Sequence, residues 1–305
     1  MALNIGIDVG GTNLRIGVFS GLQLIEETRF QADFSQICKE NAPNEAWQKI
    51  LTVTDNAIQI VLAKYPDVQA IGIGFPGFID PATQLIAQSP NLPGLENVNL
   101  SADLSAKIGK KVMVENDANV AAYGEYCLAG KPDGGLIYLG LGTGVGGGLI
   151  LNGKPFVGQH GTAMEVGHII IESNGRQCGC GNKGCMEQYA SATGVAISYF
   201  NATQTQFTAH QIANLAKSGD KQAIASYDLA ANALAQALAS IAKVIDVKNV
   251  VIGGGLIGAW PLMQSAFNQR LEADLIPVLR GEIRVKISTV NDIAGMLGAA
   301  MLALR

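Results

Sequence analysis

One histidine and three cysteines form a group that is well suited to bind a metal ion. His168 is followed by Cys178, Cys180 and Cys185, and glycines separate the cysteines in the segment Gln-Cys-Gly-Cys-Gly-Asn-Lys-Gly-Cys-Met-Glu. Three thiolates and one imidazole suit tetrahedral Zn²⁺, and four protein ligands leave no open position for a reactive water. The glycines allow a short loop to wrap around an ion. The pattern predicts a structural zinc site.

Free core cysteines and a disulfide are the two alternatives to zinc. The members of a Cys-x-Cys pair such as Cys178 and Cys180 rarely meet the geometry of a disulfide. The N-terminus has no basic segment followed by a long apolar stretch, so we expect no signal peptide and a cytoplasmic protein with reduced thiols. The other two cysteines, Cys38 and Cys127, are isolated in the sequence and are interpreted as structural.

Two glycine-rich turns are candidates for binding phosphate. The first reads Asp8-Val9-Gly10-Gly11-Thr12-Asn13, and the second reads Leu141-Gly142-Thr143-Gly144-Val145-Gly146-Gly147-Gly148. Glycine lets backbone N–H groups approach a phosphate, and Asp8 could hold Mg²⁺ through water. An ordinary hairpin turn is the alternative for the first segment. Five glycines within eight residues of the second would weaken a strand pair for no structural gain, which favours phosphate binding.

Neither turn matches the commonest nucleotide-binding motifs. The P-loop pattern Gly-x-x-x-x-Gly-Lys-Ser/Thr is absent from the sequence. A dinucleotide-binding fold is not indicated either, because each turn connects two predicted strands and does not open a helix.

A carboxylate and an amide follow the predicted strand Lys111–Glu115. Asn116-Asp117 at the end of a strand suits a positioned base with a hydrogen-bonding neighbour. The same residue types are favoured at helix N-caps, so the residues alone leave both interpretations open.

The elements that must position these residues repeat once along the chain. A strand, a glycine turn and a second strand run from Ile5 to Phe19, and the same order recurs from Ile137 to Leu151. A duplicated unit of this kind predicts two similar α/β halves facing one cleft. Further predicted elements are a strand at Leu22–Thr28, a helix at Glu45–Lys64, strands at Ala70–Phe75 and Val250–Gly253, a helix at Gln222–Ile245, and a helix from Ile293 with Asn291 or Asp292 as its N-cap.

Length and charge limit the remaining possibilities. The chain has 305 residues, which suggests two domains, and 48% of them are hydrophobic. The net charge is −4 with no basic run, so we expect no nucleic-acid partner. No apolar run is long enough for a membrane span, and we expect no membrane partner.

The motifs together resemble one family. The set Gly161-x-x-x-Glu165-x-Gly167-His168, followed by Cys-Gly-Cys-Gly-x-x-Gly-Cys-x-Glu187, is similar to the signature of the ROK family (repressor, open reading frame, kinase). The two glycine turns resemble the phosphate loops of the actin-like ATPase superfamily. The resemblance extends from residue 5 to residue 304. Met164 departs from the small residue common before the glutamate, and Asn13 departs from the lysine frequent after Gly-Gly-Thr.

The resemblance implies an α/β protein with an actin-like ATPase (ribonuclease H-like) fold, in which two α/β domains surround a central cleft. Residues 1–117 plus 292–305 would form the small domain, and residues 118–291 would form the large domain with the zinc-binding loop. The implied activity is ATP-dependent transfer of phosphate to the 6-hydroxyl of a hexose. The segment Glu187–Gly194 is most similar to glucokinase members, and N-acetylmannosamine, N-acetylglucosamine and fructose are the alternative substrates.

The resemblance also implies roles for individual residues. Asp117 matches the catalytic base, and His168 would bind zinc with one ring nitrogen and a sugar hydroxyl with the other. The implied sugar contacts are Gly77, Asn91, Asn116, Asp117, Glu165, His168 and Glu187. The implied contacts to MgATP are Asp8, Gly10, Gly11, Thr12, Asn13, Gly142, Thr143, Gly144, Gly254 and Gly255.

Two other classes of protein are less favoured by the sequence. A transcriptional repressor of the same family needs a helix-turn-helix before the first glycine turn, and Asp8 is close to the start of this sequence. A chaperone or filament protein of the wider superfamily does not require the zinc motif and Glu165-x-Gly167-His168. Family members are commonly dimers or tetramers, so we expect a homodimer or homotetramer.

Overall fold

Contacts within the chain divide it into two compact units. The computed structural model describes residues 2–10, 12–89, 92–290 and 293–305. The first unit comprises Met1–Asp133, Gly148–Ala163 and Asp292–Arg305, and the second unit comprises Gly134–Gly147 and Met164–Asn291. Each unit contains its own α/β elements, and each is described separately below.

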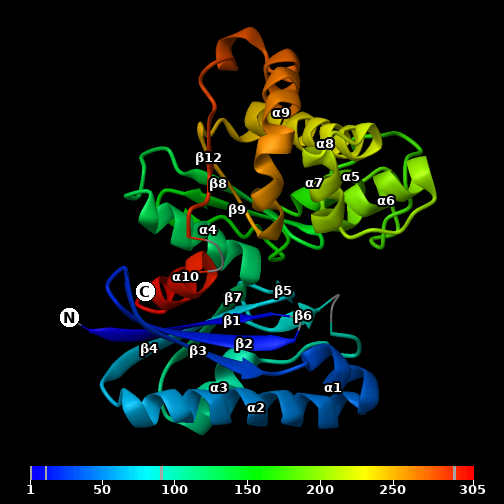
Figure 1. Cartoon of the computed structure of the whole chain (residues 1–305). Helices are drawn as coiled ribbons and strands as arrows, with labels where there is room; N and C mark the ends of the chain where they lie inside the picture. The colour runs from blue at the N-terminus through cyan, green and yellow to red at the C-terminus, as the bar shows by residue number, and fades with distance from the viewer. Residues whose placement is uncertain (1, 11, 90–91, 291–292) are drawn as a thin grey trace. The chain divides into compact units, whose positions relative to one another are not determined.

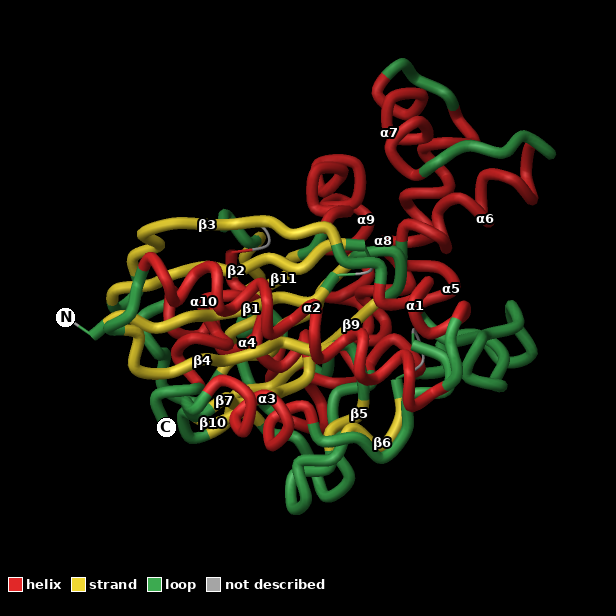
Figure 2. Tube along the Cα trace, turned by 90° about the horizontal axis from the view of Figure 1, so that it is seen from below, coloured by secondary structure: helices red, strands yellow, loops and turns green. Residues whose placement is uncertain are grey.

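A five-stranded mixed sheet forms the centre of the first unit. Its strands lie in the order β3-β2-β1-β4-β7, and Figure 2 shows them side by side. β1 is antiparallel to β2 and parallel to β4, which in turn is parallel to β7. The bounds are Leu3–Val9 for β1, Asn13–Ser20 for β2, Gln23–Gln31 for β3, Val68–Phe75 for β4 and Val112–Asn116 for β7.

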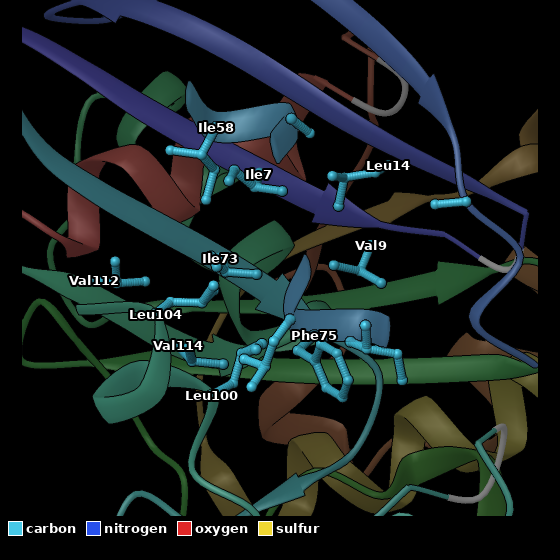
Figure 3. Packing of buried hydrophobic residues seen from close by; sticks show 14 of the residues in the cluster. Ile7, Val9, Leu14, Ile58, Ile73, Phe75, Leu100, Leu104, Val112 and Val114 are labelled. Carbon is cyan, nitrogen blue, oxygen red and sulfur yellow. The ribbon is translucent and has the colours of Figure 1, made fainter. Parts of the chain in front are cut away.

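Helices cover both faces of this sheet. One face packs against α2 and α3, where Ile58 and Leu104 meet Ile7 and Ile73 of the sheet in the apolar cluster of Figure 3. The opposite face packs against α10, whose Met296 clusters with Phe19 near the end of β2 (Figure 1). The helices are α1 (Phe34–Glu40), α2 (Pro43–Lys64), α3 (Leu100–Ile108), α4 (Asp117–Leu128) and α10 (Ile293–Leu302).

Glycines allow α10 to lie against the sheet at backbone distance. A Cβ added to Gly6 of β1 would lie 1.7 Å from the carbonyl oxygen of Met296, and one added to Gly72 of β4 would lie 1.9 Å from that of Ala299. No side chain fits at these distances, so part of the glycine content serves packing and not ligand binding.

The second sheet has the same strand order as the first. Its strands lie in the order β10-β9-β8-β11-β12, with β8 parallel to β11 and β11 parallel to β12. The bounds are Leu136–Leu141 for β8, Val145–Leu151 for β9, Lys154–Pro155 for β10, Asn249–Gly253 for β11 and Arg284–Ile287 for β12. Numbered by their appearance in each half, both sheets read third, second, first, fourth and fifth strand. The prediction of a duplicated α/β unit is confirmed.

Helices dominate the rest of the second unit. The long helix α8 (Lys221–Ile245) packs against α6 (Ala192–Thr203), α7 (Ala209–Lys217) and α9 (Trp260–Asp274). Within the described residues, α8 alone is long and apolar enough to cross a membrane, and 56% of its apolar window is buried inside the protein. Such burial is typical of a core helix. Shorter elements are α5 (Glu187–Ala190) and the 3₁₀ helices η1 (Val166–His168), η2 (Gly255–Ala259) and η3 (Pro277–Leu279), and a small hairpin of β5 (Phe78–Ile79) and β6 (Ile86–Gln88) belongs to the first unit.

The division of the chain differs from the predicted domain limits. Residues 118–133 and 148–163 belong to the first unit, although the sequence placed 118–291 in a single domain. The reason is packing: a Cβ added to Gly124 of α4 would lie 2.0 Å from the carbonyl oxygen of Ala294 in α10. Helix α4 is therefore held by the first unit. The predicted N-cap of α10, Asn291 or Asp292, lies outside the described residues.

Candidate active site

Asn116 begins helix α4 at the end of β7. Its Oδ1 accepts hydrogen bonds from the backbone N–H of Ala118 at 3.0 Å and of Asn119 at 3.1 Å, which makes it the N-cap. Its Nδ2 donates to the carbonyl oxygen of Gly77 at 3.2 Å. The two interpretations of Asn116-Asp117 are thus separated, because Asn116 caps the helix and Asp117 is the first helical residue.

Asp117 is a carboxylate whose pKa is raised in the folded protein. Its Oδ1 accepts a hydrogen bond from the backbone N–H of Ala118 at 2.9 Å. Burial raises the pKa of the Asp117 carboxyl, and the hydrogen bond to Ala118 opposes the rise only in part. A carboxylate with a raised pKa accepts a proton more readily than an ordinary aspartate.

Glu115 is a third polar residue at this point, and the sequence analysis assigned it no role. Its Oε1 accepts hydrogen bonds from the backbone N–H of Asn116 at 2.9 Å and from Nδ2 of Asn119 at 3.2 Å. Burial raises the pKa of the Glu115 carboxyl as well. A charged residue at the end of an apolar strand, directly before Asn116, is the signal that could have identified it.

Gly77 joins this group from the turn between β4 and β5. A Cβ on Gly77 would lie 3.0 Å from the carbonyl oxygen of Gln88, so a side chain would disturb the turn whose carbonyl binds Asn116. The structure therefore brings Gly77, Asn116 and Asp117 together in the first unit. Asn91, the other sugar contact predicted for this half, lies outside the described residues.

The first glycine turn connects β1 to β2. The backbone N–H of Gly10 donates to the carbonyl oxygen of Asn13 at 2.9 Å, and Nδ2 of Asn13 donates to Oγ1 of Thr12 at 3.0 Å. Thr12 and Asn13 are exposed, as a ligand-binding turn requires. Gly11 lies outside the described residues.

An ion-pair network supports Asp8 at the base of this turn. Nη1 of Arg15 lies 4.0 Å from Oδ2 of Asp8, and Nε of Arg15 lies 3.0 Å from Oε1 of Glu27. Arg15 stands opposite Asp8 in the antiparallel register of β1 and β2. The sequence analysis missed Arg15, although its position at the start of the second strand could have indicated this pairing.

The second glycine turn is held by three hydrogen bonds from the segment 187–193. Oε2 of Glu187 accepts from the backbone N–H of Val145 at 2.9 Å. The backbone N–H of Ala192 donates to the carbonyl oxygen of Gly142 at 3.0 Å, and Oγ1 of Thr193 donates to that of Thr143 at 2.8 Å. Glu187 thus lies against the turn predicted to bind phosphate.

Gly254 also lies beside the second turn. Its backbone has a φ of 88°, and a Cβ there would lie 2.4 Å from the carbonyl oxygen of Leu141. Both features require glycine. The second unit therefore brings Gly142, Gly144, Gly254 and Glu187 close to one another, while Gly255 begins η2.

The cysteine group has the geometry of a four-ligand metal site. Within the described residues, one ligand atom from each of His168, Cys178, Cys180 and Cys185 lies within 4.8 Å of the others. Nδ1 of His168 lies 3.6 Å from Sγ of Cys178, and the Sγ atoms of Cys180 and Cys185 are also 3.6 Å apart. Tetrahedral Zn²⁺ with Zn–S bonds of about 2.3 Å and Zn–N bonds of about 2.0 Å spaces its ligand atoms by roughly 3.5–3.8 Å.

The chemistry of these ligands also fits a cation. Burial and the neighbouring thiols raise the pKa of Cys185 to about 12, so an ionised Cys185 at this position requires a positive charge beside it. Nε2 of His168 faces away from the thiols and lies 3.8 Å from Oε2 of Glu165. The two ring nitrogens of His168 therefore have different partners, and Glu165 and His168 lie together as the sequence predicted.

The two sheets have the same strand order, and a glycine turn follows the first strand of each. This arrangement is the actin-like ATPase fold with two domains. The chain belongs to the ROK family, whose profile matches residues 4–305.

Relatives of known name match nearly the whole chain. The glucokinase of Thermotoga maritima is 31% identical over 98% of this chain and 96% of its own length. The N-acetyl-D-glucosamine kinase of Shigella boydii is 34% identical over 98% of each chain. Among solved structures, the ROK hexokinase of Thermus thermophilus aligns with a TM-score of 0.83 and 29% identity over 99% of this chain and 98% of its own. The glucokinase of Streptomyces griseus, in complex with glucose and AMPPNP, aligns with a TM-score of 0.78 and 30% identity over 99% of each chain.

Proposed function

We propose that the protein is an ATP-dependent sugar kinase that transfers the γ-phosphate of ATP to the 6-hydroxyl of a hexose, with glucose as the first candidate substrate. The observation that carries the proposal is Asp117, a carboxylate with a raised pKa that is fixed at the end of β7 by the Asn116 cap. The relatives named as sugar kinases support the same activity.

Asp117 would accept the proton of the sugar hydroxyl as that oxygen attacks the γ-phosphate. A hexose presents hydroxyls around its whole edge, and carboxylates and amides can bind them in pairs. We assign these contacts to Gly77, Asn91, Asn116 and Asp117 of the first unit and to Glu165, His168 and Glu187 of the second unit.

The glycine turns would bind MgATP. Their backbone N–H groups can approach the phosphates because no Cβ intervenes, and Asp8 would hold Mg²⁺ through water. The residues assigned to this task are Asp8, Gly10, Gly11, Thr12, Asn13, Gly142, Thr143 and Gly144, with Gly254 and Gly255 on the adenosine side. Phosphoryl transfer depends mostly on such positioning and charge stabilisation.

His168, Cys178, Cys180 and Cys185 would hold a structural Zn²⁺. With Nδ1 as the metal ligand, Nε2 remains available to Glu165 and to a sugar hydroxyl. Metal ligation fixes the ring orientation and tautomer of a histidine. A metal site next to the sugar would therefore hold His168 in the orientation that a sugar contact needs. No open ligand position remains, so the chemistry stays with Asp117.

N-acetylglucosamine is the second candidate substrate. The 34% identity to a protein named N-acetyl-D-glucosamine kinase favours it alongside glucose. N-acetylmannosamine and fructose complete the set that the sequence left open. The choice depends on space near the second carbon of the sugar, where these substrates differ.

The first experiment is ADP release from MgATP with glucose, mannose, fructose, N-acetylglucosamine and N-acetylmannosamine. We expect strong release with one sugar. Asp117→Asn should lower kcat by about 10²–10⁴-fold with little change in sugar affinity. Asp103→Asn is the matched control, because Asp103 accepts a hydrogen bond from Trp47 (2.9 Å) outside the site, and it should retain turnover. Silence across the sugars, or normal turnover in Asp117→Asn, would overturn the proposal.

We further propose a homodimer or homotetramer in the cytoplasm. The ROK family resemblance supports this assembly state, and light scattering after size-exclusion chromatography tests it. A monomeric mass at micromolar concentration would contradict it.

A further inference from the structure

Arg176 lies just before the loop that carries Cys178, Cys180 and Cys185. Its side chain binds the backbone of the segment that follows this loop. Its Nη1 donates to the carbonyl oxygen of Gln188 at 2.6 Å and to that of Gly194 at 3.1 Å. Its Nη2 donates to Oγ of Ser198 at 3.0 Å. One guanidinium therefore joins α5 to the first turns of α6.

Tyr189 strengthens the same connection from the other side. The guanidinium of Arg176 lies 4.4 Å from the centroid of the Tyr189 ring, and the Tyr189 hydroxyl accepts a hydrogen bond from the backbone N–H of Arg176 at 3.0 Å. Tyr189 is buried. Three hydrogen-bond acceptors and one aromatic ring therefore hold the guanidinium of Arg176 in place.

The segment that Arg176 holds is the one that holds the second glycine turn. Glu187 precedes Gln188 and binds the N–H of Val145, whereas Ala192 and Thr193 precede Gly194 and bind the carbonyls of Gly142 and Thr143. Arg176 thus binds the residue directly after Glu187, which is Gln188, and the residue directly after Thr193, which is Gly194.

We propose that Arg176 is a positioning residue for nucleotide binding, which it serves by fixing the α5–α6 segment against the turn Gly142–Val145. This inference rests on the proposed assignment of that turn to ATP. None of the hydrogen bonds of Arg176 described above is made to a residue of the turn. It acts through Glu187, Ala192 and Thr193.

The test compares the affinities for nucleotide and for sugar in Arg176→Met. Hydrogen bonds to a charged group are strong enough that their loss should raise the Kd for a non-hydrolysable MgATP analogue by about tenfold. The sugar Kd should change less, because Glu187 is the one assigned sugar contact that lies in the segment held by Arg176, whereas Asn116, Asp117 and Glu165 lie outside that segment. Arg270→Met is the matched control, since Arg270 also binds two groups in the second unit, Gln236 at 2.8 Å and Asp274 at 2.6 Å, away from the turn. It should leave both affinities near those of the natural protein.

Thr193→Val removes one contact to the turn directly and supplies a double-mutant cycle. If Arg176 acts through this segment, the combined variant should bind nucleotide more tightly than the product of the two single effects predicts. Zinc content and unfolding temperature are measured for every variant. Equal losses of sugar and nucleotide affinity with lost zinc would show a structural role only and overturn the inference.

The kinase proposal and this inference fail in different ways. If the natural protein binds no MgATP analogue, the assignment of the glycine turns is wrong, and the role of Arg176 falls with it. If the natural protein binds nucleotide and Arg176→Met binds it equally well, only the positioning role is wrong.

Discussion

The two glycine turns occupy equivalent places in two sheets of the same strand order, yet their surroundings differ. In the first unit, charged side chains on neighbouring strands support the turn, with Arg15 between Asp8 and Glu27. In the second unit, the turn is supported by hydrogen bonds from another segment, among them the carboxylate of Glu187.

This difference indicates how a duplicated fold can divide its tasks. Two strands and a glycine turn are enough to repeat the backbone that we propose for phosphate binding, because such binding needs only backbone N–H groups. The supporting side chains are then free to diverge. The first unit adds the carboxylates Glu115 and Asp117, and the second unit adds the group of His168 and three cysteines, which precedes the helix carrying Glu187.

The largest expected effect concerns the zinc site that we propose for the second unit. Cys185→Ser removes a fully buried ligand, and we expect it to abolish binding of about one zinc ion per chain and to lower the unfolding temperature strongly. Metal content by atomic emission and thermal unfolding measure both effects.

Cys127→Ala serves as the control for Cys185→Ser. Cys127 is a buried cysteine of the first unit, outside the four-ligand group, so its replacement should leave the zinc content unchanged. Zinc retained in Cys185→Ser, or absent from the natural protein grown with zinc, would contradict the metal assignment.

The next effect compares the two turns directly. A Cβ on Gly144 would lie 2.4 Å from Oε2 of Glu187, whereas a Cβ on Gly10 would lie 3.3 Å from the carbonyl oxygen of Asn13. Neither glycine has a positive φ, so the outcome depends on the neighbouring atoms, and at Gly144 the Glu187 carboxylate could move aside only by giving up its hydrogen bond to Val145. Gly144→Ala should raise the Kd for MgATP by about tenfold, the size expected for overpacking, and Gly10→Ala should raise it less. The reverse order, measured by titration calorimetry, would refute this account of the second turn.

A smaller effect concerns stability in the first unit. Because burial raises the native pKa of Asp117, the ionised form destabilises the folded state, and this loss develops as the pH rises from the unfolded pKa of about 3.9 through the native pKa. Asn does not titrate, so Asp117→Asn should unfold at a higher temperature than the natural protein at pH 8. The difference should shrink toward pH 4. An equal or lower unfolding temperature for the variant at pH 8 would contradict the raised pKa.

The fold was predictable where the local pattern of apolar residues and glycines determines a strand or a helix. Apolar strands and glycine turns predicted two strand-turn-strand units, Ile5–Phe19 and Ile137–Leu151, and their outer limits agree within two residues with those of β1–β2 and β8–β9. Helical spacing predicted α2 and α8. The limits of the units were not predictable in the same way. They depend on α4 packing against α10, a contact between residues far apart in the sequence that involves backbone at Gly124 and Ala294.

The residues of the candidate site were predictable where they belong to a sequence motif. The four candidate metal ligands were identified from residue types and spacing, and they lie together in the structure. Arg15, Glu115 and Arg176 were missed, because what distinguishes them is their contacts with other protein groups, which no sequence motif displays. Arg176 illustrates the limit, since its partners Gly194 and Ser198 are reached only after the chain has folded back.

The smallest expected effect asks which carboxylate of the first unit is the base. In Glu115→Gln the side-chain oxygen can still accept from Asn116 and Asn119, so kcat should stay within about threefold of the natural value. Glu115→Ala leaves both donors without this acceptor and should lower kcat by about tenfold through a displaced Asn116 cap. The pH dependence of kcat gives the deciding measurement. If Asp117 is the base, activity falls as the pH drops through its raised pKa in the natural protein and in Glu115→Gln alike. If that fall disappears in Glu115→Gln, Glu115 is the titrating group and the roles of the two carboxylates must be exchanged.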